Sequence, residues 1–366
     1  MIKFLDLKAL NTRFRDEFNE AFNTFLNSGH YVLGQGVIDF EESFSKYCNA
    51  KYCVGVSNGL DALILIFKAY IQLGKLKKGD EVIVPSNTYI ATILSILEVD
   101  LKPIFVEPNI DTFNCEALEI EKHITNKTKA ILIVHLYGQL AKTKAIKQLA
   151  INNDILLIED AAQAHGAISI ENDLAGSIGN AAAFSFYPTK NLGALGEAGA
   201  VTTNDDNLAK VVKELRNYGT SKKHNNVRIG VNNRIDELQA LFLKIKLKNL
   251  NEDNKKRRDT AKRYLNEIKN EKIKLPYYDG SKNHVFHQFV ILVESRDEFI
   301  DYLNKEGIQS AIHYPKPPHK QQALIAYSKL FLPIADRIHN TCVSLPINPL
   351  LTDVEVSKII NSINHF

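Results

Sequence analysis

Short apolar runs alternate with longer helix-like stretches between residues 52 and 205, and this alternation is the strongest constraint on the fold. The expected strands are residues 53–56, 82–84, 104–106, 131–134, 155–158, 182–186 and 199–203. A run such as Ile155-Leu156-Leu157-Ile158 has no polar side chain on either face, so we expect it to be buried from both sides. The pattern therefore predicts an α/β fold, with a mostly parallel sheet that is covered by helices on both faces.

The pattern changes to an α+β arrangement after about residue 236. The expected elements are a long helix at 238–250, a strand at 286–293 and helices at 296–306 and 352–365. A chain of 366 residues is also longer than one small core requires. We therefore expect a large domain over residues 1–250 and a smaller C-terminal domain over residues 251–366.

Four phenylalanines recur at helical spacing near the N-terminus: Phe14, Phe18, Phe22 and Phe25. They predict an amphipathic helix over residues 1–30, whose aromatic stripe is interpreted as a core or subunit contact. We expect this helix to pack near the small domain.

The composition excludes several classes of partner. The formal net charge is only +3, and the one short basic run, Lys255–Arg258, is followed at once by an acid, which favours a solvated helix face over a nucleic-acid site. The four cysteines have no zinc-site spacing, so no metal is expected. No apolar run approaches the roughly 20 residues that span a bilayer, and the first residues do not resemble a signal peptide. We expect a cytoplasmic protein that binds neither membranes nor nucleic acid.

Two charged residues stand where the pattern places the rim of the buried sheet. Asp160 follows the apolar run at 155–158, at the edge where α/β proteins bind ligands. Lys190 follows the next predicted strand, in the segment Phe184–Gly193. A lysine there can form a Schiff base, and a carboxylate can hold a protonated pyridine nitrogen. Each alone has an ordinary interpretation as a surface lysine or a helix cap, but the pair predicts pyridoxal phosphate (PLP) chemistry with Lys190 and Asp160 as catalytic residues.

Several neighbouring segments have the chemistry of a PLP site. The turn Ser57-Asn58-Gly59-Leu60 leads from a strand into a helix, whose free N–H groups could hold a phosphate, although an ordinary Asn/Gly cap fits equally well. Ser185 could bind the same phosphate. Tyr89 could stack on a flat ring or be a core tyrosine. Gln163 could donate a hydrogen bond to the ring oxygen, whereas His165 is interpreted as a core histidine.

Three other polar or glycine-rich segments are less specific. Gly193–Gly199 precedes a strand instead of opening a helix, so it is no dinucleotide fingerprint and is interpreted as a tight hairpin, which argues against an NAD-dependent dehydrogenase. Gly230–Ala240 could reach a phosphate through its amides and Arg234, or simply cap a helix. The Pro-stiffened loop His313–His319 suits a sugar or phosphate pocket, or a plain connector.

Taken together, residues 57–63, 160–166, 185–193 and 230–240 resemble, in order and spacing, the sugar-nucleotide aminotransferases of the DegT/DnrJ/EryC1/StrS family. These are fold-type I PLP enzymes. The resemblance implies a large domain with a mostly parallel seven-stranded sheet, a small C-terminal domain, and a homodimer with the active site at the subunit interface.

The resemblance also implies roles for individual residues. Lys190 corresponds to the lysine that binds the cofactor covalently, Asp160 to the partner of the ring nitrogen, and Gln163 to the contact with the ring oxygen. Tyr89 corresponds to the stacking ring. The implied phosphate contacts are Asn58, Gly59, Leu60, Ser185 and, from the neighbouring subunit, Asn232. Two positions depart from the family pattern: Ser57-Asn58-Gly59 stands where many members have Ser-Gly-Thr, and Val231 replaces a common aromatic residue.

A finer resemblance, carried by residues 215–219, 234–239 and 312–319, is to the subgroup that aminates C3 of dTDP-3-keto-6-deoxyhexoses. It implies L-glutamate as the amino donor, 2-oxoglutarate as its product, and a role in bacterial surface glycans such as lipopolysaccharide. The implied substrate contacts are Tyr187, Tyr218, Arg234, His313, Tyr314 and His319.

Other functions stay open at this point. One is a C4-aminotransferase acting on a UDP- or dTDP-linked 4-keto sugar, and another is a PLP-binding sensor or regulatory protein without turnover. A sugar 3-dehydratase of the same family would carry His at the lysine position, so Lys190 argues against it. The sequence does not fix the configuration of the sugar at C4.

Overall fold

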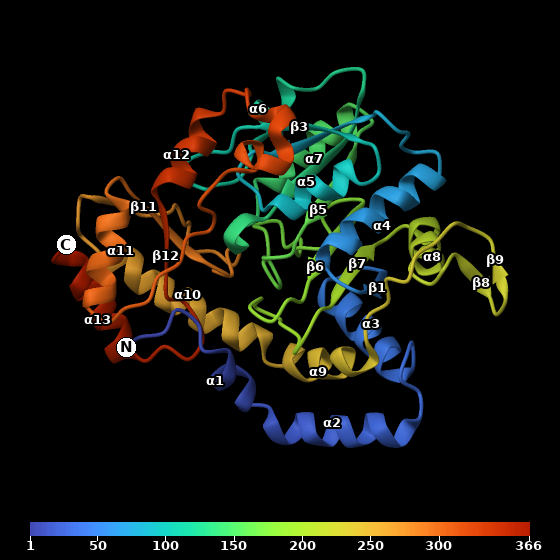
Figure 1. The fold of residues 1–366 in the computed structure, drawn as a ribbon, viewed down its shortest axis with the longest axis horizontal. Helices are drawn as coiled ribbons and strands as arrows, with labels where there is room; N and C mark the ends of the chain where they lie inside the picture. Colours follow the sequence, from blue (N-terminus) through green and yellow to red (C-terminus); the bar gives the residue numbers. More distant parts are fainter.

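The computed structural model describes residues 1–366 and has a seven-stranded sheet at its centre (Figure 1). The strand order is β1-β7-β6-β5-β4-β2-β3, and only β7 runs antiparallel to its neighbours. The strands are β1 (Tyr52–Val56), β2 (Glu81–Pro85), β3 (Lys102–Val106), β4 (Thr128–Val134), β5 (Leu156–Asp160), β6 (Ala181–Ser185) and β7 (Gly199–Thr203). The predicted fold class, with its mostly parallel seven-stranded sheet, is confirmed.

Helices cover both faces of this sheet because alternate side chains of each buried strand point to opposite sides. One face packs against α4 (Gly59–Gln72), α5 (Ile90–Leu97) and α8 (Asp206–Leu215). The other packs against α3 (Gln35–Tyr47), α6 (Ala117–Glu121), α7 (Thr143–Asn152) and α9 (Glu237–Leu247). Neighbouring residues of β5 illustrate the alternation, since Ile158 belongs to the first face and Leu157 to the second.

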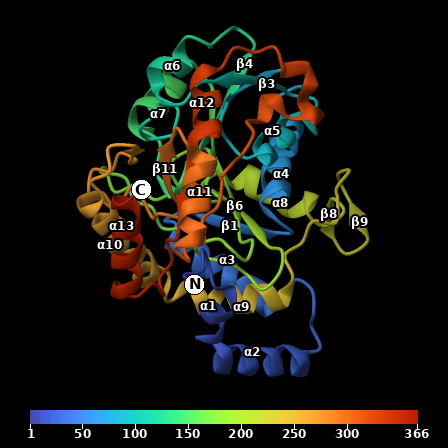
Figure 2. The same ribbon diagram turned by 60° about the vertical axis from the view of Figure 1, so that its left-hand side comes forward.

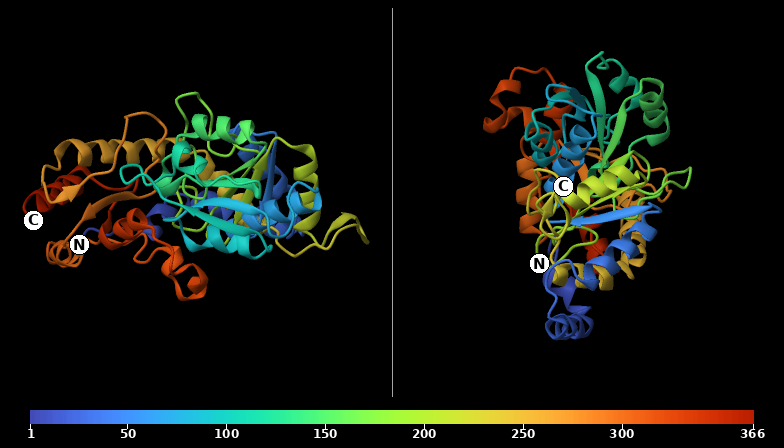
Figure 3. Two further views of the ribbon diagram at one scale, coloured as in Figure 1. Left: turned by 90° about the horizontal axis from the view of Figure 1, so that it is seen from above. Right: turned by 90° about the vertical axis from the view of Figure 1, so that its right-hand side faces the viewer.

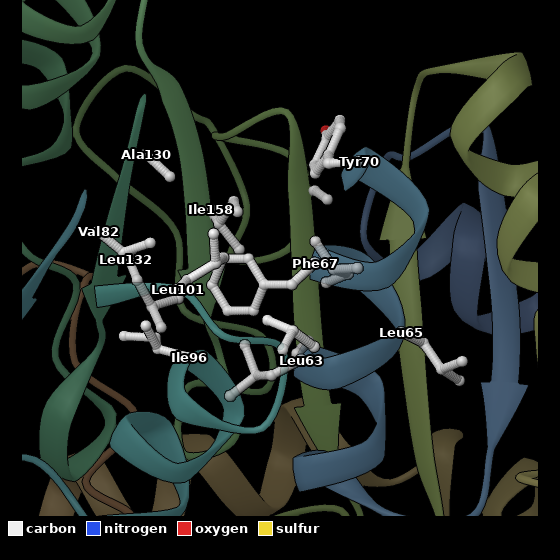
Figure 4. Packing of buried hydrophobic residues seen from close by; sticks show 14 of the residues in the cluster. Leu63, Leu65, Phe67, Tyr70, Val82, Ile96, Leu101, Ala130, Leu132 and Ile158 are labelled. Atoms are coloured by element: carbon white, nitrogen blue, oxygen red, sulfur yellow. The ribbon is translucent and has the colours of Figure 1, made fainter. Parts of the chain in front are cut away.

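Helix α4 is held in place by a well-packed apolar cluster (Figure 4). Its Leu63 and Phe67 point toward Ile96, Leu101 and other side chains beside the sheet, whereas Leu65 points to the opposite side of the helix. Phe67 is fully buried, so we expect its truncation to Ala to cost about 3–5 kcal/mol. This packing fixes the start of α4 at the carboxyl edge of the sheet, where the candidate site lies.

A second core lies around a three-stranded antiparallel sheet at the end of the molecule that holds both termini (Figures 2 and 3). Its elements are β10 (Ile273–Lys274), β11 (Phe289–Val293), β12 (Cys342–Leu345), α10 (Leu250–Glu267), α11 (Arg296–Lys305) and α13 (Asp353–Asn364). Ile2 pairs with Ile308 and is buried in this core. The domain division at residue 250 stays a prediction; α10 runs across it, with Leu250 in the core around α3 and Tyr264 in the second core.

The remaining elements complete the fold. They are η1 (Leu136–Gly138), η2 (Pro318–Lys320), η3 (Gln322–Tyr327), α12 (Pro333–Thr341), β8 (Thr220–Lys222) and β9 (Asn225–Asn226). The β8–β9 hairpin projects from the body of the molecule beyond α8, at the end away from the termini (Figures 1 and 3). No helix has both the length and the apolar character needed to cross a membrane.

The structure corrects several expected elements. The N-terminal segment forms two helices, α1 (Leu7–Thr12) and α2 (Arg15–Ser28), because the chain turns at Phe14, which packs with Phe18 against Phe242 of α9. The expected helix at 238–250 ends at Leu247, and α10 begins as a separate helix. The strand expected at 286–293 begins only at Phe289, since Phe286 has a positive φ that interrupts extended backbone.

The interpretation of residues 193–199 as a tight hairpin is also wrong. Strands β6 and β7 do pair as antiparallel neighbours, but the connection between them runs from Phe186 to Ala198 and contains Lys190. Its ends are joined by the hydrogen bonds Phe186 N to Ala198 O and Ala194 N to Phe186 O. The glycines therefore form part of the long loop that carries the lysine.

Candidate active site

Lys190 and Asp160 lie at the carboxyl edge of the sheet. Asp160 is the last residue of β5, and Lys190 follows the parallel strand β6, in a turn closed by its N–H to the carbonyl of Tyr187 (2.8 Å). The charge of each group acts on the pKa of the other, so the two side chains lie near each other. The structure thus brings together the two residues from which the sequence predicted PLP chemistry.

The Lys190 amine lies in surroundings that disfavour its charge. Burial lowers the pKa of Lys190 to about 8, and the Asp160 carboxylate opposes this shift. The residue is only partly buried, so a ligand can reach this side chain. A substantial fraction of this lysine is therefore neutral near pH 8, as a nucleophile or general base requires.

The Asp160 carboxylate is buried but well supplied with hydrogen bonds. The hydroxyl of Thr92 donates to Oδ2 (2.8 Å), and the backbone N–H of Ala162 donates to Oδ1 (3.2 Å). Burial raises the pKa of Asp160, while these two donors and the Lys190 charge lower it. A cationic N–H donor such as a pyridinium would favour the ionised carboxylate further.

Gln163 has an orientation that is set by the backbone. Its Oε1 accepts from the N–H of Tyr137 (2.6 Å), so its NH2 group must lie on the other side, where it donates to the Tyr314 hydroxyl (3.0 Å). The Tyr314 ring lies against Tyr89, with 5.1 Å between the ring centroids. Tyr89 precedes α5 and is half exposed, so its ring is open to a ligand instead of being buried in the core.

A third corner of the site is the start of α4. The N–H groups of Gly59 and Leu60 make no hydrogen bond within the chain, as expected in the first turn of a helix. A Cβ on Gly59 would lie 2.6 Å from Cβ of Ser185, and one on Gly199 would lie 2.3 Å from the Asn58 carbonyl carbon. The two glycines therefore let the helix start approach the ends of β6 and β7 closely enough to form an anion-binding corner.

The Asn58 side chain is already engaged within this turn. Its Oδ1 accepts from the N–H of Asp61 (2.8 Å), and its Nδ2 donates to the Asp61 carboxylate (2.8 Å). Ser57 also hydrogen-bonds this carboxylate. The groups left to hold a phosphate here are therefore the backbone N–H groups of Gly59 and Leu60, together with the Ser185 hydroxyl.

The predicted substrate contacts fall into two sets. Burial lowers the pKa of His313 to about 4, and the charge of Lys190 adds a smaller contribution. His313 therefore lies near Lys190. Tyr314 accepts from the NH2 group of Gln163, and Tyr187 is half exposed in the loop after β6. His319, in contrast, is fully buried, with Nε2 3.2 Å from the Asp336 carboxylate.

The second set lies at the base of the projecting β8–β9 hairpin. The Arg234 guanidinium lies over the Tyr218 ring (5.6 Å) and donates to Asn217 (3.1 Å), while the exposed Asn232 pairs with Asn217 through the backbone. None of the three has a contact with Lys190 or Asp160 in this chain. Their roles, like those of the other site residues, stay predictions.

Sequence reasoning missed three residues of the site. Thr92 contacts Asp160 across 68 positions, which no local pattern reveals. Asn191 directly follows Lys190, donates to Asn254 Oδ1 (2.8 Å) and Val285 O (3.1 Å), and accepts from Nδ1 of His287 (3.2 Å). Burial lowers the pKa of His287 well below its usual value, and the Lys190 charge lowers it further. The position of Asn191 beside the lysine was the only available signal.

Comparison with known proteins defines the class. Residues 12–364 match the DegT/DnrJ/EryC1/StrS aminotransferase family. The chain is 51% identical to a dTDP-3-amino-3,6-dideoxy-α-D-galactopyranose transaminase of Aneurinibacillus thermoaerophilus, over all of this chain and 99% of the relative. The crystal structure of S. venezuelae DesV in complex with a ketimine intermediate has a TM-score of 0.95 at 39% identity, covering all of this chain and 98% of DesV. NtdA from Bacillus subtilis with bound cofactor PMP has a TM-score of 0.91 at 31% identity, covering all of this chain and 84% of NtdA.

The chain therefore belongs to the DegT/DnrJ/EryC1/StrS aminotransferase family and is a PLP-dependent aminotransferase. The hydrogen-bonding groups of the site fit this cofactor. A buried carboxylate lies near Lys190, the NH2 of Gln163 is turned toward Tyr314 by the backbone, and the first turn of α4 has unpaired N–H groups that suit a phosphate.

Proposed function

We propose that this aminotransferase moves the amino group of L-glutamate to C3 of a dTDP-linked 3-keto-6-deoxyhexose. The assignment of the substrate rests on one observation. The chain is 51% identical, over essentially both full lengths, to a transaminase named for a dTDP-3-amino-3,6-dideoxy sugar. A lysine with a lowered pKa facing a buried carboxylate supports the chemistry. The residues that contact the sugar and the phosphate are likewise proposed.

In this proposal, PLP supplies a ring that stores the electron pair released when a C–H bond beside nitrogen is broken. Asp160 accepts a hydrogen bond from the protonated ring nitrogen, and Gln163 donates one to the ring oxygen. Tyr89 stacks on the ring. Gly59, Leu60 and Ser185 would hold the phosphate, and Asn58 would fix their turn through its hydrogen bonds to Asp61.

Lys190 moves the protons. As a neutral amine it would accept the α-proton of L-glutamate and pass it to the cofactor, with which the amino group stays, while water supplies the keto oxygen of the departing 2-oxoglutarate. As an ammonium it then returns a proton to C3 of the sugar. The pKa of about 8 supports this double role, because the two protonation states are both populated near neutral pH. The proposed sugar contacts are Tyr187, Tyr218, Arg234, His313, Tyr314 and His319, of which the buried His319 has the weakest support.

We further propose a homodimer in which Asn232 of the partner subunit completes the phosphate site. The supporting observation is the projecting hairpin region, which carries apolar side chains into solvent. Ile229 is 95% exposed and Val227 is half exposed. Exposed apolar groups clustered on one projection favour a protein contact over free solvent. The four free cysteines support a reducing, cytoplasmic setting, where the product would enter surface glycan synthesis such as that of lipopolysaccharide.

The test is a product panel. The purified protein, PLP and 15N-labelled L-glutamate are incubated with dTDP- and UDP-linked 3-keto and 4-keto sugars, and the products are identified by mass spectrometry. We expect the 15N label at C3 of the dTDP-linked 6-deoxyhexose, and a loss of about a thousandfold or more in Lys190→Ala. Labelling of only a 4-keto sugar, or cofactor binding without any labelled sugar, would overturn the proposal in favour of a C4-aminotransferase or a sensor.

A further inference from the structure

Two buried threonines form a hydrogen-bonded chain that ends at Asp160. Thr88 lies in the turn after β2, and Thr92 lies one helical turn later, in α5. The two hydroxyl oxygens are 2.8 Å apart, and Thr92 Oγ1 is 2.8 Å from Oδ2 of Asp160. Thr88 is 2% exposed, Thr92 1% and Asp160 9%, so bulk water does not compete for these bonds.

The chain has a direction, because each hydroxyl carries a single proton. When Asp160 is ionised, Thr92 donates to the carboxylate, and Thr88 must then donate to Thr92. If Asp160 were protonated on Oδ2 and donated to Thr92, the direction would reverse, and the Thr88 hydroxyl would be left without another acceptor in the protein. A buried donor without a partner is costly. The hydroxyl chain therefore favours the ionised carboxylate.

The surroundings of Asp160 have opposite effects on its negative charge. The Ala162 N–H, Lys190 from the β6–β7 connection and His135 after β4 favour the negative charge, as Thr92 does from α5, while burial disfavours it. The Oδ2 bond to Thr92 and the Oδ1 bond to Ala162 also fix the plane of the carboxylate. Among these groups, Thr92 donates to Asp160 from its side chain, whereas Ala162 donates from its backbone.

We infer that Thr92, aligned by Thr88, is a positioning residue that keeps Asp160 ionised and correctly oriented toward the cofactor ring. The inference rests on the proposed role of Asp160 as the partner of the ring nitrogen. It assigns a function to a hydroxyl pair that the aminotransferase chemistry itself does not require. The hydroxyls act through Asp160 and have no direct part in proton transfer to the substrate.

The test measures binding of PLP to the apoprotein by equilibrium dialysis, without glutamate or sugar. Thr92→Val keeps the side-chain shape but removes the donor, and we expect the dissociation constant to rise about tenfold or more, as for loss of a hydrogen bond to a charged group. Thr92→Ser restores the hydroxyl and should bind within about threefold of the unaltered protein. Ser95→Ala is the matched control, since Ser95 is equally buried on α5 but donates to the Thr92 carbonyl (2.8 Å).

A double-mutant cycle separates this role from simple packing. In an Asp160→Asn background there is no carboxylate charge to hold, so adding Thr92→Val should change PLP binding little. Thr88→Val should give a smaller loss than Thr92→Val, and keeps the test open if the latter does not fold. The acid limb of PLP binding should also move to higher pH in Thr92→Val, because the lost donor no longer lowers the pKa of Asp160.

Two results would overturn the inference: unchanged PLP binding in Thr92→Val, or an equal loss in the Asp160→Asn background. Neither result depends on which sugar is aminated. If the sugar proposal fails, the binding cycle keeps its meaning. If the binding cycle fails while labelled amino sugar is formed, only the role of the threonines is wrong.

Discussion

At the scale of single residues, the site works through opposed effects on two charges. Burial disfavours the charged form of both Lys190 and Asp160, while each charge stabilises the other. The lysine ends with a pKa of about 8. The carboxylate is held by Thr92 and by a backbone N–H. We propose that a flat cationic ring binds between this amine and this acid.

The pKa of Lys190 gives the first prediction. The rate at which the apoprotein takes up PLP should rise with pH and level off above a midpoint of about 8, since only the neutral amine attacks the aldehyde. In Asp160→Asn the midpoint should fall, because the carboxylate that stabilises the ammonium is gone. The measurement is the growth of visible absorbance after mixing, followed across pH. A midpoint near that of an ordinary lysine would contradict the account.

At the residue scale, the sequence could predict positions where the signal was local. Lys190 and Asp160 were placed at one edge of the sheet because each follows a strongly apolar strand, and their roles stay predictions. The supports of the site were not found, because they join distant segments. Gln163 meets Tyr314 across 151 positions, and Thr92 meets Asp160 across 68. Such contacts depend on how whole elements pack, which spacing along the chain does not encode.

At the scale of elements, the phosphate corner depends on the close approach of α4 to β6. The apolar face of α4 packs against the sheet and brings Gly59 against Ser185, where no Cβ fits. The glycine's presence was visible in the sequence, but its neighbour was not. The misjudged elements have the same origin: the turn at Phe14 and the late start of β11 at Phe289 follow from tertiary packing and one backbone conformation.

The second prediction concerns this approach. Gly59→Ala would place a Cβ 2.6 Å from Cβ of Ser185, and a Cβ held by the backbone cannot move aside easily. We expect the free energy of unfolding to fall by about 1–3 kcal/mol and PLP binding to weaken by about tenfold. Thermal unfolding and dialysis measure the two effects.

Gly196→Ala is a suitable control for that experiment. Its added Cβ would meet only the Gln239 side chain, at 3.2 Å, which can shift slightly. It should leave both stability and PLP binding close to those of the unaltered protein. Unchanged PLP binding in Gly59→Ala would show that the start of α4 is not part of the cofactor site.

At the scale of the whole molecule, one chain alone does not bring all of the predicted cofactor and substrate contacts together around Lys190. The Arg234 guanidinium lies over the Tyr218 ring, and Arg234 and Asn232 both pair with Asn217 beside the projecting hairpin, with no hydrogen bond to Lys190 or Asp160. The proposed homodimer would bring this region to the active site of the other subunit. The sheet could be predicted because alternation over many strands is a redundant signal, and the family because four motifs agree in order and spacing. An intersubunit contact leaves no periodic pattern of this kind.

The third prediction tests this arrangement. Ile229→Asp places a charge on a side chain that is 95% exposed in the single chain and that we propose is buried between subunits. We expect the dimer to dissociate, as seen by light scattering after size-exclusion chromatography, and PLP affinity to fall by about tenfold or more as Asn232 of the partner subunit is lost.

Val354→Asp is the matched control, because Val354 is also largely exposed (80%) but lies on α13, in the second core region. It should change neither the mass of the particle nor PLP binding. A dimer that persists unchanged in Ile229→Asp would place the subunit contact elsewhere.

The most direct test of the central claim is to reduce the protein–PLP complex with borohydride and locate the attached cofactor by peptide mass spectrometry. The account predicts the cofactor on Lys190 alone, with labelling sharply reduced in Asp160→Ala at equal PLP concentration. Cofactor attached to another lysine, or labelling of Lys190 that does not depend on Asp160, would contradict it.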